Sequence, residues 1–186
     1  MQANKIHIKI FAQNPPEPDH LVPVFHSWIR EKKLDELAID VANYEHVHEG
    51  PGVVLVGNAF DYYWDLGDGR PGLIYSRKRN TPPPEARLAD AVRRTLVGCR
   101  LLEQDPALPG LSFRTNELVV RLADRLHAPS NAAGFEALKL ELEPLVSKLY
   151  GVPATIERVG DDRDILGARV TVLAAGSVAD LLARLS

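Results

Sequence analysis

Two strand-like runs on either side of a glycine-rich turn constrain this fold more than any other feature of the chain. The runs are Phe60–Leu66 and Leu73–Arg77, and the turn between them reads GDGRPG. Glycine and proline favour a tight chain reversal, and strands this close in sequence pair as a hairpin. The sequence therefore predicts antiparallel pairing at its centre.

Other segments carry the hydrophobic patterns of strands. Lys5–Ala12 reads KIHIKIFA, with an isoleucine at every second position, which indicates a strand buried on one face. Val53–Gly57 is continuously apolar and predicts a strand buried on both faces. Shorter candidates are Leu37–Ala42, Leu111–Phe113, Glu117–Leu122, Ala154–Val159 and Ala168–Leu173.

Helical spacing of apolar residues predicts helices over about His20–Lys33, Glu85–Gln104 and Asn131–Tyr150. Pro144 predicts a kink or break in the third. A capping box at Ser177–Asp180 begins a short final helix. The order strand-strand-helix recurs, ending near residues 104, 150 and 185. This mixture favours an α+β fold in which helices pack on one face of a largely antiparallel sheet.

Length and composition narrow the class of protein. The 186 residues, 45% of them hydrophobic, suit one compact α+β domain over 1–186, with two packed halves, 1–104 and 111–186, as the alternative. A net charge of −3 argues against a nucleic-acid partner, because bulk attraction to phosphates needs a positive excess. The single cysteine, Cys99, falls on an apolar helical stripe, which favours a packed and unreactive thiol.

The start of the chain, MQANKIHIKIFAQNPP, lacks the pattern of a secretory signal. No apolar run approaches the roughly 20 residues that a membrane-spanning helix needs. From these two observations we expect a cytoplasmic protein that does not bind a membrane.

Candidate chemistry is concentrated between Tyr44 and Arg79, where His46 and His48 are separated by one residue. On an extended segment both imidazoles would point to the same side, about 7 Å apart at their roots. They could then bind a divalent metal, with Glu49 as a third ligand or general base. The competing interpretation is that the two rings hydrogen-bond to loop carbonyls.

The same region holds groups suited to an anion. Gly50 and Gly52 permit close backbone approach, so their amides could cradle a small anion, or they could simply allow a tight turn into the following strand. Arg70 and Arg77 could bind a phosphate or carboxylate through their guanidinium forks, although a run such as RKR is also typical of a solvated strand edge. P-loop, dinucleotide, HEXXH and serine-elbow motifs are absent.

The block HVHEGPGVVLVG, followed by GRPGLIYSRKR, resembles a block in uncharacterised bacterial proteins of similar size. The resemblance covers most of the chain. It implies a bacterial, soluble protein and no activity, cofactor or catalytic residue.

Three function hypotheses follow. The first is a non-catalytic protein that binds a small anionic ligand or acts as an accessory factor, and that self-associates through a sheet edge or helix face. The second is a metal-dependent hydrolase that uses His46, His48 and Glu49, since a bound metal makes water a nucleophile near neutral pH. The third is a structural module that contacts another protein through the histidine-glycine block.

Overall fold

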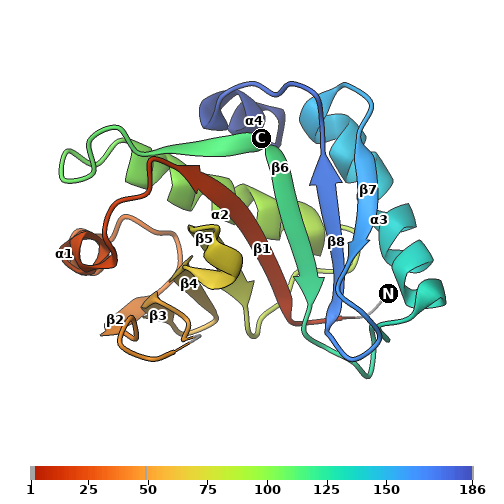
Figure 1. Cartoon of the computed structure of the whole chain (residues 1–186), viewed down its shortest axis with the longest axis horizontal. Helices are drawn as coiled ribbons and strands as arrows, with labels where there is room; N and C mark the ends of the chain where they lie inside the picture. The colour runs from red at the N-terminus through yellow and green to blue at the C-terminus, as the bar shows by residue number, and fades with distance from the viewer. Residues whose placement is uncertain (1–2, 49, 186) are drawn as a thin grey trace.

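The computed structural model describes residues 3–48 and 50–185, in which eight antiparallel strands form one sheet in the order β2-β3-β4-β5-β1-β6-β8-β7 (Figure 1). The strands are β1 (Ile6–Gln13), β2 (Ala38–Asn43), β3 (Val53–Gly57), β4 (Phe60–Asp65), β5 (Gly72–Arg77), β6 (Ser112–Leu122), β7 (Thr155–Val159) and β8 (Leu166–Thr171). The expected hairpin is confirmed, because β4 and β5 pair antiparallel from Phe60–Arg77 to Asp65–Gly72.

The helices lie against one face of the sheet. They are α1 (Leu21–Arg30), α2 (Arg87–Glu103), α3 (Ala132–Tyr150) and α4 (Val178–Leu185), with short 3-10 turns η1 (Pro18–His20) and η2 (Gly67–Gly69). Helix α1 packs on β2 and β3, α2 crosses β5, β1 and β6, and α3 packs on β8, while α4 contacts α2 and α3. The predicted α+β class and the predicted antiparallel sheet are confirmed.

Strand register explains why the helices use one face. A row of paired residues on the helix side is buried throughout: Leu55, Tyr62, Tyr75, Ile8, Val120 and Ala168. The next row points to the opposite side and mixes apolar and charged residues: Val54, Tyr63, Ile74, Lys9, Val119 and Arg169. Successive side chains in a strand alternate between faces, so the KIHIKIFA pattern alone assigns its isoleucines to the core.

We call the side of the sheet without helices the open face. Its most buried charged side chains are paired with other charged groups although no helix packs on them. Lys9, only 7% exposed, pairs with Asp65 of β4. Asp61, 6% exposed, accepts hydrogen bonds from Lys78 Nζ at 2.7 Å and from the Tyr63 hydroxyl at 3.1 Å. Pairing of this kind offsets the cost of removing these charges from water.

Two expected interruptions are absent. Residues 112–122 form one strand instead of two short ones, with a register shift against β1 between Ile10 and Ala12. Helix α3 continues through Pro144, which is exposed. The missing proline amide would have bonded the carbonyl of Leu140, whose residue is also exposed, so water can take its place.

The sheet is continuous across 1–104 and 111–186, because β1 lies between β5 and β6. The strand-strand-helix order holds for β4-β5-α2 and β7-β8-α4, whereas β6 alone precedes α3. Cys99 is fully buried on α2, and burial raises the pKa of its thiol well above the ordinary value, as expected for a packed cysteine.

The sheet ends at β2 and β7, and the β2 edge carries exposed Leu37 and Ile39. In the part of the chain that the structure describes, no helix is both long and apolar enough to span a bilayer.

Two glycines with left-handed backbones provide a matched test of the packing. Gly52 has φ 70°, and an added Cβ would lie 2.1 Å from the Trp64 carbonyl oxygen, whereas Gly69 has φ 62° and open space around it. We expect Gly52→Ala to lower the free energy of unfolding by about 3 kcal/mol or more, through strain and a backbone clash. Gly69→Ala should lower the free energy of unfolding by only about 1 kcal/mol, because it adds backbone strain without a clash. Urea unfolding measures both, and equal losses would contradict the described turn.

Candidate functional site

Three connections meet at one end of the sheet: residues 14–19 after β1, 44–52 between β2 and β3, and 66–71 between β4 and β5. Strand register brings them together, because Phe11 near the end of β1 pairs with Gly72 at the start of β5, and Gly72 pairs with Asp65 at the end of β4. The Ala12 amide also donates to the Pro71 carbonyl at 2.9 Å.

Three adjoining hollows lie among these connections. The basic hollow, about 480 Å³, is lined by residues 11–15 and 69–71 and by Arg114. The proline hollow, about 520 Å³, is lined by residues 15–19 with Glu45, His46, Leu66 and Pro71. The histidine hollow, about 610 Å³, lies between residues 65–67 and the connection that contains His48, Gly50 and Gly52.

The two predicted histidines lie in turns and not on an extended segment. The Val47 amide donates to the Tyr44 carbonyl and the Gly50 amide to the Val47 carbonyl, each at 2.9 Å. The turns orient the rings differently, so His46 lines the proline hollow and His48 the histidine hollow. Glu49 lies outside the described residues.

Among residues 3–48 and 50–185, no group of three or more His, Cys, Asp or Glu side chains is placed to hold a metal ion. Two of the neighbouring carboxylates have partners, since Asp65 pairs with Lys9 and Asp19 accepts from the Asn43 amide at 3.0 Å. Metal binding by His46 and His48 stays a prediction, and the described geometry adds no third ligand to it.

Gly50 and Gly52 shape the turn that enters β3. An added Cβ on Gly50 would lie 2.8 Å from the Cβ of Val47. The Gly52 carbonyl accepts from the Tyr44 amide at 2.8 Å, which closes the connection between β2 and β3. These contacts give both glycines a packing role, while both also line the histidine hollow.

Arg77 lies on the helix side of β5, in a buried ionic network under α2. It is 4% exposed and contacts Glu36 at 2.6 Å and Asp90 at 3.1 Å. Arg94 contacts the same two carboxylates, each at 2.9 Å. Arg77 lines none of the three hollows, and it lies five positions along the strand from Gly72, a distance of about 17 Å. The structure therefore separates Arg77 from the other predicted ligands.

Arg70 reaches from the β4–β5 connection across the open face. Its guanidinium carbon lies 3.7 Å from the centroid of the Phe11 ring, and its nitrogens donate to both carboxylate oxygens of Glu117 on β6, at 2.9 and 2.6 Å. A stacked guanidinium with a two-point carboxylate contact is held in one orientation. Arg70 therefore forms a fixed wall of the basic hollow.

Glu117 is surrounded by arginines. Besides Arg70, it contacts Arg169 of β8 at 3.2 Å and feels the charge of Arg114. The Arg70 hydrogen bonds, with the charges of the three arginines, hold the pKa of Glu117 below its ordinary value against the opposing effect of burial. Three cations thus share one carboxylate.

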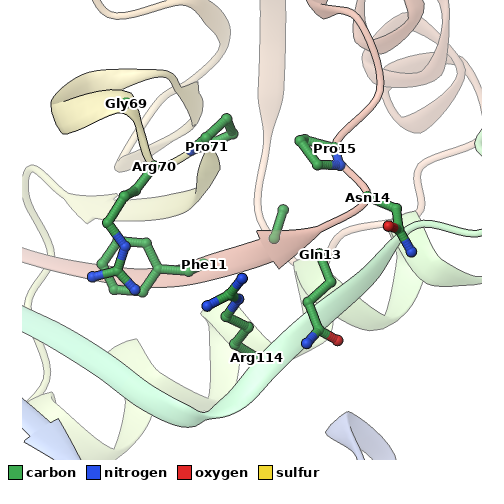
Figure 2. A pocket seen from close by; sticks show the side chains of 9 residues that line it. Phe11, Gln13, Asn14, Pro15, Gly69, Arg70, Pro71 and Arg114 are labelled. Atoms are coloured by element: carbon green, nitrogen blue, oxygen red, sulfur yellow. The ribbon is translucent and has the colours of Figure 1, made fainter.

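Arg114 belongs to the basic hollow and is exposed. Figure 2 shows it rising from β6 beside Phe11, while Arg70 approaches the same space from the β4–β5 connection. Within the described residues, no carboxylate lies within ion-pair distance of Arg114, and none lines the basic hollow. The side-chain amides of Gln13 and Asn14 add hydrogen-bond donors.

Sequence reasoning found Arg70 but missed Arg114 and Glu117. Arg70 and Glu117 are 47 positions apart, and their contact spans β5, β1 and β6. Arg114 falls at the irregular part of β6, which was expected to be a break between two strands. No local pattern marks either residue.

Comparison of the chain with protein-family models, with curated proteins and with solved structures gave no match in any of the three.

The Arg77 network predicts a large structural effect. Arg77→Met should lower the free energy of unfolding by about 3 kcal/mol or more, because it removes the buried guanidinium that joins the partly buried carboxylates of Glu36 and Asp90. Arg79, an exposed neighbour, provides the control. Arg79→Met should change the free energy of unfolding by less than about 0.5 kcal/mol. Chemical denaturation measures both, and similar small effects would contradict a structural role for Arg77.

The lowered pKa of Glu117 predicts a pH-dependent contribution to stability. A carboxyl whose pKa is lower in the folded state stabilises the fold above its unfolded pKa, near 4.5, and loses this effect as pH falls through the folded pKa. The destabilisation by Glu117→Gln should therefore be full at neutral pH and shrink below pH 4.5. Denaturation at several pH values tests this. Glu136→Gln, at an exposed site on α3, is the control, and a pH-independent Glu117→Gln effect would contradict the ion pairing.

Proposed function

We propose that this protein binds a small anion, a carboxylate or a phosphate, in the basic hollow, and that it acts as a non-catalytic ligand-binding or accessory protein of the bacterial cytoplasm. The observation that carries the proposal is the charge balance around Glu117. Within the described residues, the charges of three arginines act on this one carboxylate, and no acidic side chain lines the hollow that Arg114 faces. An incoming anion would supply the missing negative charge.

The chemistry of the lining supports an anion more than a neutral ligand. A guanidinium presents planar N–H donors that match carboxylate and phosphate oxygens. Gln13 and Asn14 offer amide donors on the opposite side of the hollow from Gly69–Pro71. Phe11, Pro15 and Pro71 supply apolar surface, which lowers the local dielectric and strengthens a charged contact.

The fixed position of Arg70 supports the same proposal. Its contacts with Phe11 and Glu117 hold the guanidinium before any ligand arrives, so little side-chain entropy is lost on binding. Arg70 therefore contributes a positive potential and a shaped wall. Arg114, which is exposed, supplies the direct contact.

The other two hypotheses have less support. A hydrolase that uses His46 and His48 would need both rings on one metal, and they line different hollows. Contact with another protein through the histidine-glycine block stays a prediction. Self-association through a sheet edge, which belongs to the first hypothesis, is consistent with exposed Leu37 and Ile39 at β2, and sedimentation velocity can check it. Neither hypothesis accounts for the arginines around Glu117.

Arg114→Gln tests the anion site. We expect it to weaken binding of inorganic phosphate and acetate by about tenfold or more, because a hydrogen bond to a charged group is worth roughly 1.5–3 kcal/mol. Arg114 is chosen over Arg70 because removing Arg70 would leave Glu117 short of its main partner. Amide chemical-shift titration gives the dissociation constants and reports whether residues 11–15 respond.

Arg100→Gln is the matched control, since it removes an equal charge from an exposed site on α2. It should leave both affinities nearly unchanged. Equal losses of affinity in the two variants would show bulk charge attraction only and would contradict a site at Arg114. If the unaltered protein binds neither phosphate nor acetate, the proposal is wrong.

A further inference from the structure

The three hollows adjoin one another at the end of the sheet, and together we call them the groove. Pro15 and Pro71 line both the basic and the proline hollow. Glu45 and Leu66 line both the proline and the histidine hollow. Each hollow therefore shares walls with the next, and the groove runs from Arg114 past the prolines to His48.

Charge changes sign along this groove. Among the described residues, the basic hollow is lined by Arg70 and Arg114 and by no acidic side chain. The proline hollow is lined by three carboxylates, Glu17, Asp19 and Glu45, and by no lysine or arginine that the structure describes. In the described part of the chain, none of these three carboxylates forms an ion pair with a cation, although Asp19 accepts from Asn43.

Apolar surface separates the two charged regions. Pro15 and Pro71 line both the basic and the proline hollow, so their rings lie at the boundary between them. The carboxylates lie in the proline hollow itself, and Glu45 also lines the histidine hollow beyond it. A molecule that lies from the basic hollow into the proline hollow would meet cationic groups, then these rings, then carboxylates, and the opposite charges fix its direction.

We propose that the groove binds the C-terminal end of a peptide, with its free carboxylate at Arg114, small apolar residues over the prolines, and a lysine or arginine side chain at Glu17 and Glu45. This rests on the proposed anion site and names its ligand class. A peptide end carries these three chemical features in this order. Three adjoining hollows also exceed the space that a single carboxylate or phosphate fills.

The test uses a series of N-acetylated peptides in which lysine is followed by an alanine spacer of increasing length and a C-terminal leucine. Each is made with a free carboxylate, with a C-terminal amide, and with norleucine in place of lysine. Calorimetric titration into the full chain should show the free acid with lysine binding most tightly at one spacer length. Amidation should weaken it by about tenfold and norleucine by about threefold.

Variants assign each end of the peptide to its part of the groove. Arg114→Gln should remove the preference for the acid over the amide and keep the preference for lysine over norleucine. Glu17→Gln combined with Glu45→Gln should do the reverse. Glu136→Gln combined with Glu143→Gln, which removes two exposed carboxylates from α3, should change neither preference.

The outcomes separate this inference from the anion site itself. If phosphate and acetate bind through Arg114 but lysine and norleucine peptides bind equally at every spacer length, the peptide assignment is wrong and the anion site stands. If the acid and amide peptides bind equally, the assignment of the peptide's free carboxylate to Arg114 is wrong. If neither small anions nor peptides bind, both proposals fail together.

Discussion

The helices cover one face of the eight-stranded sheet, so the side chains on its other face have to bury one another. Lys9 and Asp61 are almost fully buried there although no helix lies over them. Burial of a charge without a partner would cost several kcal/mol, and each of these groups is accordingly paired across strands. The open face is therefore an ionic layer, and the connection between β4 and β5 joins it when Arg70 contacts Glu117.

This ionic layer is balanced over most of the sheet and unbalanced at one end. Asp61 is paired with Lys78, and Asp65 with Lys9. Glu117, by contrast, is shared by three arginines that come from β6, β8 and the β4–β5 connection. This positive charge lies at the end of the sheet where the three connections form hollows that a ligand can enter. A structural requirement of the sheet thus places surplus positive charge beside a cavity.

Local patterns were enough to predict the elements but not the site. Alternation in Lys5–Ala12 placed Ile6, Ile8 and Ile10 in the core, where the structure has them. The two-strand expectation for 111–122 was wrong, because pairing with β1 carries a single strand through the irregular segment. Long-range pairing of this kind overrides local breaks, and it has no signature in a short window of sequence.

The histidine pair and the arginines show a second limit, which concerns side-chain direction. The spacing of His46 and His48 would have aligned them on a strand, but hydrogen bonds from Val47 and Gly50 curl the segment into turns. The arginines of the basic hollow converge only after β5, β1 and β6 have paired, which no spacing within one element encodes.

In the sequence, Arg70 and Arg77 are equivalent candidates for binding an anion, seven positions apart. The number of carboxylates around each arginine distinguishes their roles. Arg77 and Arg94 share Glu36 and Asp90, and Arg93 contacts Asp90 and Asp35, so three arginines meet three carboxylates and this network is balanced in charge. Around Glu117, the described residues place the charges of Arg70, Arg114 and Arg169, and Arg114 forms no ion pair with a described carboxylate. The exposure of Arg70 alone does not decide between a structural role and a ligand-binding role, because Arg70 is itself well paired. The local shortage of negative charge, and not the presence of an arginine, is what marks the basic hollow as a place for an anion.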